Sequence, residues 1–246
     1  FCASGIRNAG HLGRIGAWPE QLAEAGLASI HFVNTSGFGI LVAPHGGSDR
    51  RLSANPIGAG IPVAGGEPII LDIATSIVAE GKIQIARNRG EQLKPELVID
   101  GTGKPTTDPA SFYADPPGAI FPFGAHKGFG LSVVCEILAG SLTGGGSSHP
   151  DNASASRLVN NMLSVAFDPA AFPSDAFADD VKRLSAWVKG SPPLEPGGEV
   201  LLPGEIESRT VVRRTAEGIP LDAETIRQLA VTARQLGVPM IADLER

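Results

Sequence analysis

Three short clusters in this sequence hold residue types and spacings that could do chemistry. The first is NAGHLGR at 8–14, in which His11 stands between Gly10 and Gly13. A histidine held in a tight turn with backbone amides close by suits a general acid or base, because imidazole titrates near neutral pH. A loop histidine without a role fits the same residues equally well, so this pattern alone leaves both interpretations open.

The second cluster is DIATS at 72–76, whose hydroxyls and amides could bind a ribose or a phosphate, although an ordinary strand end is the simpler interpretation. The third is GAHKGFG at 124–130, which opens an apolar stretch of helical length. Helix amides with Lys127 and a nearby His126 would form an anion site, because a lysine at a helix N-terminus opposes the macrodipole unless an anion lies between them. A weaker fourth candidate, PGE at 203–205, is interpreted as a turn.

Other catalytic and binding classes lack their motifs. The sequence has no G-x-S-x-G elbow, no Walker A loop and no G-x-G-x-x-G after a strand, which argues against an α/β-hydrolase, a P-loop NTPase and a Rossmann domain. Its five histidines show no ligand spacing, so no metal site is predicted.

The net charge of −6 argues against a nucleic-acid binder. No apolar run reaches the roughly 18 residues needed to cross a bilayer. Two distant cysteines, Cys2 and Cys135, predict a reducing, cytoplasmic environment.

The elements that must position these clusters alternate between strand and helix patterns. We predict a polar loop over 5–16 and strands over 27–35, 68–77, 82–87 and 161–168. We predict helices over 19–25, over 127–142 (apolar on most faces and therefore buried), over 178–189, and from an N-cap at Asp222 to a stop at Gly237. Cys135 is assigned to the core, whereas Glu136 beside it either meets a buried partner or marks an exposed helix edge. Alternation without strict βαβ spacing predicts an α/β or α+β chain with a mixed sheet.

The clusters also form an ordered set with other short motifs along the chain. The set comprises NAGHLGRIG (8–16), NTSG (34–37), ANPIGAGIP (54–62), LDIATS (71–76), AEGKI (79–83), GKPTTDP (103–109), PFGAHKGFGL (122–131), LAGSLTG (138–144) and LPGE (202–205). In this order, and over nearly the whole chain, the set resembles the malate/L-lactate dehydrogenase-like family of NAD(P)-dependent oxidoreductases. That family includes ureidoglycolate, sulfolactate and 2,3-diketogulonate-type enzymes and a cyclic-imine reductase.

The resemblance implies a non-Rossmann α/β fold around a mixed sheet, a homodimer, and hydride transfer between NAD or NADP and a small 2-hydroxy or 2-oxo acid. His11 matches the loop histidine regarded in part of the family as the acid/base. The implied cofactor contacts are Thr35 or Ser36, then Asp72, Ile73, Ala74, Thr75 and Ser76, then Lys127 and Gly128, and finally Gly204 and Glu205. His126 is a further candidate near the substrate.

One departure from the family pattern concerns the start of the chain. Relatives carry an N-terminal helical segment with an Asp-x-His-Gly type motif and an arginine for the substrate carboxylate, and nothing here matches it. We therefore expect a single oxidoreductase domain over 1–246 that is N-terminally truncated. Two alternatives remain open: a cyclic-imine 2-carboxylate reductase of the same family, and a non-catalytic cofactor-binding remnant. The sequence does not choose between NAD and NADP.

Overall fold

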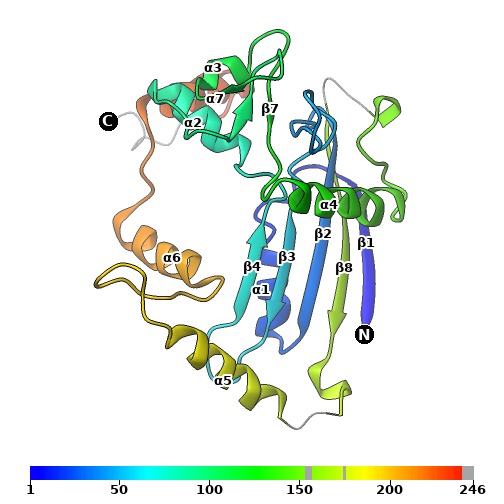
Figure 1. The fold of residues 1–246 in the computed structure, drawn as a ribbon, viewed down its shortest axis with the longest axis vertical. Coiled ribbons are helices and arrows are strands. Elements are labelled where there is room, and N and C mark those ends of the chain that lie inside the picture. The colour runs from blue at the N-terminus through cyan, green and yellow to red at the C-terminus, as the bar shows by residue number, and fades with distance from the viewer. Residues whose placement is uncertain (153–156, 174–175, 240–246) are drawn as a thin grey trace.

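The computed structural model describes residues 1–152, 157–173 and 176–239. It is an α/β fold with two sheets, of strand order β1-β8-β2-β3-β4 and β6-β5-β7, which confirms the predicted fold class (Figure 1). All pairings between these strands are antiparallel, so the sheets are antiparallel where a mixed sheet was expected. An isolated parallel bridge joins Val42 to Ile120. Within the described part of the chain, no helix combines the length and apolar character needed to cross a membrane.

The large sheet positions most of the polar residues that matter below. It consists of β1 (Cys2–Ala9), β8 (Leu158–Phe167), β2 (Ala28–Gly37), β3 (Ile57–Ile61) and β4 (Ile69–Ile73). β8 lies between β1 and β2, and its Asn160 is paired with Ala9 on one side and with Thr35 on the other. The end of β1 and the end of β2 are therefore held together through one residue of the strand between them.

The small sheet belongs to a separate hydrophobic cluster. Its strands are β5 (Val98–Ile99), β6 (Pro105–Thr106) and β7 (Ala119–Ile120), and α2 (Glu80–Arg89) and α3 (Pro109–Phe112) pack with them. Ile83, Val98 and Phe112 are fully buried in this cluster. The Arg50 guanidinium lies 4.4 Å from the centre of the Phe112 ring and closes the cluster with a cation–π contact.

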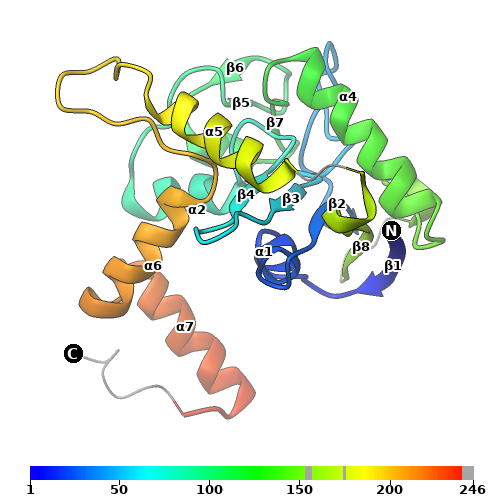
Figure 2. The same ribbon diagram turned by 90° about the horizontal axis from the view of Figure 1, so that it is seen from below.

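Helices cover both faces of the large sheet. On one face α1 (Ala17–Glu24) packs against β2 and β3. On the other lie α4 (His126–Cys135) and its π-helical continuation η1 (Glu136–Ser141), which packs on β2 and β8 (Figures 1 and 2). Two short 3₁₀ turns, η2 (Pro150–Asn152) and η3 (Pro169–Ala171), flank β8 along the chain.

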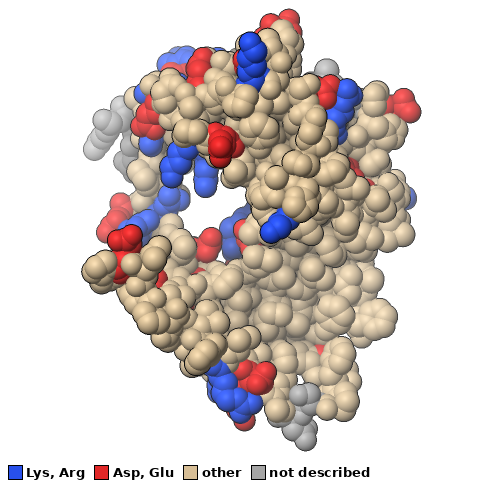
Figure 3. All heavy atoms as spheres, viewed as in Figure 1, with Lys and Arg blue, Asp and Glu red and all other residues tan. Residues whose placement is uncertain are grey.

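Three further helices form an extension that we call the C-terminal arm, residues 177–236. They are α5 (Phe177–Lys189), α6 (Glu205–Glu217) and α7 (Ala223–Leu236), and none of their residues is buried. The arm begins after β8 and η3, passes β4 where the Ile70 amide donates to the Pro203 carbonyl, and returns to contact α2 through α7. Figure 3 shows an opening between the arm and the body, with charged side chains of both signs at its rim.

Several predicted elements are confirmed. The predicted strands over 27–35 and 161–168 are β2 and β8, and the helices over 19–25 and 178–189 are α1 and α5. The carboxylate of Asp222 accepts a hydrogen bond from the Thr225 amide at 2.8 Å and caps α7, as predicted. Gly237 follows α7 with a φ of 66°, the left-handed conformation that ends a helix. The strand predicted over 68–77 is shorter and ends at Ile73.

Three local predictions are wrong. The predicted loop over 5–16 begins only after Ala9, because β1 is an edge strand held by backbone pairing to β8 and needs few apolar side chains. The predicted strand over 82–87 is part of helix α2. The alternating Ile83 and Ile85 indicated a strand, yet the buried pair is Ile83 and Ala86, three residues apart, while Ile85 is 43% exposed. The helix over 127–142 is present but not buried all round, since Ile137 is 55% exposed.

Candidate active site

A cavity of about 460 Å³ lies where the loop after β1 meets β2, β8 and the start of α2. Its polar side chains are His11, Thr35, Ser53, Glu80 and Asn160. Its apolar wall includes Ile15, Val33, Phe38, Leu41 and Leu158. Because one side is apolar and the other offers a few convergent polar groups, the cavity has the character of a small-molecule site.

His11 lies in the loop that follows β1 and contributes to the cavity wall. Its Nδ1 accepts a hydrogen bond of 2.9 Å from the Gly13 amide. A neutral imidazole that accepts at Nδ1 carries its proton on Nε2, so in this state Nε2 offers an N–H donor to a ligand. Gly13 has a φ of 76°, a conformation that glycine adopts without strain and that brings its amide back to the ring.

Thr35 and Ser36 fall on opposite faces of β2, as consecutive strand residues must. Thr35 lines the cavity, and its Oγ1 accepts a hydrogen bond of 2.7 Å from the Asn160 side-chain amide. Ser36 is 2% exposed and is not among the cavity residues. Of these two predicted cofactor contacts, the geometry therefore brings Thr35 to His11.

The segment Asp72–Ser76 follows β4 and borders the cavity without lining it. Asp72 accepts a hydrogen bond of 2.8 Å from the Gly16 amide, which ties β4 to the end of the His11 loop. The Thr75 and Ser76 hydroxyls donate to the carbonyls of Ala54 and Val78, each at 2.9 Å. Their protons are therefore used within the protein, unlike the free hydroxyl donors that the sequence pattern anticipated. Ile73 and Ala74, between these residues, are half-buried.

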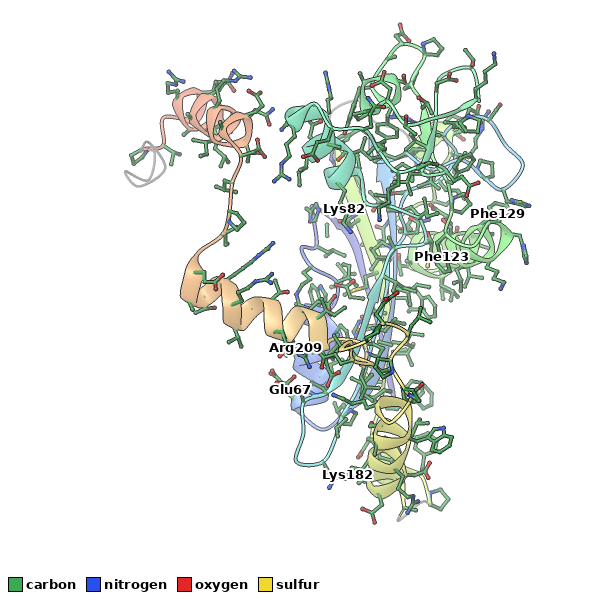
Figure 4. All side chains as sticks on the ribbon, turned by 60° about the vertical axis from the view of Figure 1, so that its left-hand side comes forward. Glu67, Lys82, Phe123, Phe129, Lys182 and Arg209 are labelled. Carbon is green, nitrogen blue, oxygen red and sulfur yellow. The ribbon has the colours of Figure 1, made fainter. Side chains whose placement is uncertain are left out.

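Lys127 and Gly128 lie at the start of α4, directly beside this segment. A Cβ on Gly128 would lie 2.4 Å from the Phe123 carbonyl oxygen and 2.6 Å from that of Thr75, so only glycine permits this approach. Figure 4 shows Phe123 and Phe129 at this end of α4. Lys127 and His126 are exposed, and the His126 ring lies 6.1 Å from that of His45 rather than at the cavity.

Gly204 and Glu205 begin α6 and lie at a second hollow, of about 390 Å³, which shares no residue with the His11 cavity. This hollow is lined by Glu67, Glu205, Ser208, Arg209 and Val212. Figure 4 shows Glu67 and Arg209 close together here, with Lys82 of α2 across the opening. Hydrogen bonds from Lys189 and from the Leu202 amide hold the pKa of Glu205 below its usual value.

A buried polar network beside the cavity was not predicted from the sequence. The Glu136 carboxylate, 5% exposed, contacts the side-chain amides of Asn34 and Asn55 at 2.9 and 2.7 Å. It also contacts the amide and hydroxyl of Ser148, each at 2.8 Å. Of the two alternatives for Glu136, the buried partner is therefore correct. The sequence signal was the pair Asn160-Asn161 in an apolar strand, since asparagine is depleted from strands.

Two other titratable side chains, His31 and Cys135, are buried away from the cavity and are unsuited to proton exchange with a ligand there. Burial lowers the pKa of His31 to about 4, and its ring is held by Ser164 and Ser29 at 2.8 and 3.1 Å. Burial also raises the pKa of the Cys135 thiol to about 12, which keeps it protonated and fits its assignment to the core. Neither residue lines the cavity, so His11 is the histidine available there.

Comparisons with known proteins agree on one family. The model of the family described as malate/L-lactate dehydrogenase matches residues 1–230. Hydroxycarboxylate dehydrogenase B of Escherichia coli O157:H7 is 39% identical over 241 residues, which are 97% of this chain and 66% of that protein. A delta(1)-pyrroline-2-carboxylate/delta(1)-piperideine-2-carboxylate reductase of Pseudomonas syringae pv. tomato is 35% identical over 92% of this chain and 64% of that protein.

A solved structure of a dehydrogenase from Sinorhizobium meliloti superimposes with a TM-score of 0.80 and 34% identity, covering 93% of this chain and 66% of that one. The chain thus spans 64–66% of the length of the two curated relatives named above.

Proposed function

Because the chain belongs to the malate/L-lactate dehydrogenase family, we propose that it transfers a hydride between a nicotinamide cofactor and a small 2-hydroxy or 2-oxo acid. The observation that carries the proposal is the placement of His11, whose ring contributes to a cavity shared with Thr35 while its Nδ1 is held by the Gly13 amide. Hydroxycarboxylate dehydrogenase B, the relative with 39% identity, points to the same substrate class.

His11 is the acid/base of the proposed reaction. During reduction, the imidazolium form of His11 donates its Nε2 proton to the carbonyl oxygen of the 2-oxo acid as a hydride reaches the carbonyl carbon, which leaves a neutral imidazole with its proton on Nδ1. During oxidation, that neutral form accepts the hydroxyl proton at Nε2 as the hydride passes to the oxidised nicotinamide. Because both forms carry a proton on Nδ1, the hydrogen bond from the Gly13 amide to Nδ1 opens when the ring reacts. The side chains of Val33, Phe38 and Leu41 give the cavity an apolar wall beside this exchange.

The residues around the cavity fit a dinucleotide. A Cβ on Gly10 or on Gly13 would meet no atom within 4 Å, so the backbone on both sides of His11 is open to a ligand. When bound, the reduced cofactor, NADH or NADPH, would supply the hydride, and its oxidised form would accept it in the reverse direction. Thr35 would contact it in the cavity, the 72–76 segment and Lys127–Gly128 would border it, and Gly204–Glu205 would meet its far end. Ser36 and His126 take no part in this assignment.

The remaining elements of the proposal are a single domain that works as a homodimer in the cytoplasm. A second candidate reaction is reduction of a cyclic imine 2-carboxylate. The 35% identity to the reductase from P. syringae supports this candidate. The two reactions differ in the atom that is protonated, because in the second His11 would donate its proton to an imine nitrogen and not to a carbonyl oxygen.

The first experiment is a fluorescence titration of this chain with NADH and with NADPH. We expect saturable binding of one of them, and the tighter dinucleotide identifies the cofactor. In a panel of 2-oxo acids and cyclic imines, His11→Asn should lower turnover by about 10²–10⁴-fold while dinucleotide binding persists. His149→Asn, which changes an exposed histidine away from the cavity, is the matched control. Full activity in His11→Asn would exclude the acid/base role.

A further inference from the structure

Asn160 joins two walls of the cavity through one side chain. Its Oδ1 accepts a hydrogen bond of 3.1 Å from the Leu12 amide, the residue next to His11. Its Nδ2 donates a hydrogen bond of 2.7 Å to Thr35 Oγ1. The side chain is 6% exposed, so both bonds lie largely out of competition with solvent. A planar amide offers an acceptor and a donor at a fixed separation, which sets the Leu12 backbone relative to Thr35.

The chain around His11 has few other anchors. The pairing of β1 with β8 shifts register between Ile6 and Ala9, and Asn8 there has a φ of 55°. The Asn8 amide donates to Asn161 Oδ1 at 2.9 Å, so Asn161 of β8 holds the chain at this irregularity itself. Beyond it, Asn160 is the side chain that holds the loop at Leu12.

The asparagine pair is itself rigidly supported. Asn161 Nδ2 donates to Asn34 Oδ1 at 2.9 Å, and Asn34 in turn donates to Glu136 at 2.9 Å. Asn55 donates to the same carboxylate, and its Oδ1 accepts a hydrogen bond of 3.2 Å from the Thr35 amide. Three contacts of Glu136 come from N–H groups of Asn34, Asn55 and Ser148, and the Ser148 hydroxyl makes the fourth. The network thus fixes β2 and β8 relative to each other beneath the cavity.

We propose that Asn160 is a positioning residue: by holding the Leu12 backbone, it fixes the imidazole of His11 relative to Thr35 in the cavity. The inference rests on the proposed acid/base role of His11. Proton transfer needs hydrogen-bond distance between the ring and the substrate oxygen, and a misplacement of about 1 Å costs about 10²-fold in rate. Without Asn160, the backbone at Leu12 loses its acceptor and the ring loses its fixed place.

The test compares Asn160→Ala with the rescue variant Asn160→Asp. The alanine removes both hydrogen bonds. The aspartate keeps an acceptor for the Leu12 amide, and the Thr35 hydroxyl can rotate to donate to its second oxygen. We expect Asn160→Ala to lower kcat by about 10–100-fold while the dinucleotide Kd changes by less than about threefold, and Asn160→Asp to recover most of kcat. A fall in kcat that only follows the folded fraction, or an equal loss in both variants, would overturn the proposal.

A second measurement separates this proposal from the proposed function. In the ¹⁵N-labelled protein without substrate, the ring resonances of His11 report its place and tautomer directly. They should shift in Asn160→Ala and return in Asn160→Asp, whereas those of His149 stay unchanged in both variants. Unchanged His11 resonances in Asn160→Ala would exclude positioning by Asn160 even in an active enzyme. If instead His11→Asn kept full activity, the acid/base role on which this inference rests would fail, while these resonances would still decide whether Asn160 positions the ring.

Discussion

The large sheet and the C-terminal arm use similar residues in opposite ways. In β2 and β8, asparagine, threonine and serine side chains are buried beside Val33 and Met162. In α5, α6 and α7, by contrast, no residue is buried and large apolar side chains face outward: Trp187 is 81% exposed and Val212 is 70% exposed. Burial in this chain therefore follows the position of an element in the fold rather than the polarity of its residues.

Different interactions hold the two regions in place. The sheet is fixed by a dense set of internal contacts, in which every described buried side-chain nitrogen or oxygen has a hydrogen-bond partner. The arm is fixed by caps and ion pairs, such as the Asp222 cap and the pair between Arg209 and Glu199. Deep hydrogen bonds are costly to break, whereas exposed ion pairs contribute little to stability. Matched substitutions in the two regions test this difference.

The largest effect is expected from Glu136→Gln. The variant replaces one acceptor oxygen by an NH₂ group that faces the donors of the buried network, and we expect a loss of about 3 kcal/mol in the free energy of unfolding. The matched change in the arm, Glu224→Gln, alters a glutamate of α7 whose side chain is 33% exposed and pairs with Arg227, and it should shift the urea midpoint little. Equal shifts in both variants would remove the distinction between the two regions.

A smaller effect is expected from a purely apolar pair of substitutions. Val33→Ala removes two methyl groups from a side chain that is 1% exposed and should cost about 2.5 kcal/mol. Val211→Ala makes the same change at a position that is 64% exposed and should leave the thermal midpoint unchanged. A large loss in Val211→Ala would show that another surface covers the arm in solution.

The sheet should also give the protein an acid sensitivity through His31. Burial lowers the pKa of His31 from 6.5 to about 4. His31 is therefore protonated below about pH 6.5 in the unfolded chain but only below about pH 4 in the folded chain. Stability falls as the pH drops through this window, by about 2 kcal/mol between pH 7 and pH 5. In urea titrations His31→Gln should lack this part of the slope, and His149→Gln should retain it. Identical slopes in the wild type and His31→Gln would contradict the effect.

The smallest effect is expected at the start of α7. Asp222→Ala removes the acceptor for the Thr225 amide, so the first turn of α7 should fray. Hydrogen exchange should accelerate at that turn and stay unchanged in β2 and β8. Asp222→Asn, which keeps an acceptor oxygen, is the control. Faster exchange in the sheet would show that the arm and the sheet unfold together.

Sequence patterns predicted the elements better than their surroundings. The stripe Ile226, Leu229 and Ala233 correctly indicated α7, but periodicity states only that one face is apolar and not what covers it. Isoleucines two apart suggested a strand over 82–87, where helix α2 buries Ile83 and exposes Ile85. β1 escaped prediction because an edge strand is held by its neighbour's backbone.

For the candidate site, the sequence found the loop histidine but not what holds it. His11 is conspicuous because glycines surround it. Asn160, Asn55 and Glu136 are not, because their roles depend on partners 20 to 148 residues away along the chain. The predicted contacts of Thr75 and Ser76 likewise depended on free hydroxyls, which the fold uses on nearby carbonyls.

The two edges of the large sheet differ in what they offer to other molecules. At β4, the Ile70 amide donates to the Pro203 carbonyl at 2.9 Å, and the chain leading into α6 lies against this strand. At the opposite end of the strand order, β1 presents mostly exposed residues and has no further strand beside it among the described residues. Unpaired strand edges are the sites at which proteins stack into aggregates. The β1 edge is therefore the side of this sheet that is more open to edge-to-edge stacking, and the charge of Arg7, which is exposed on it, opposes such stacking.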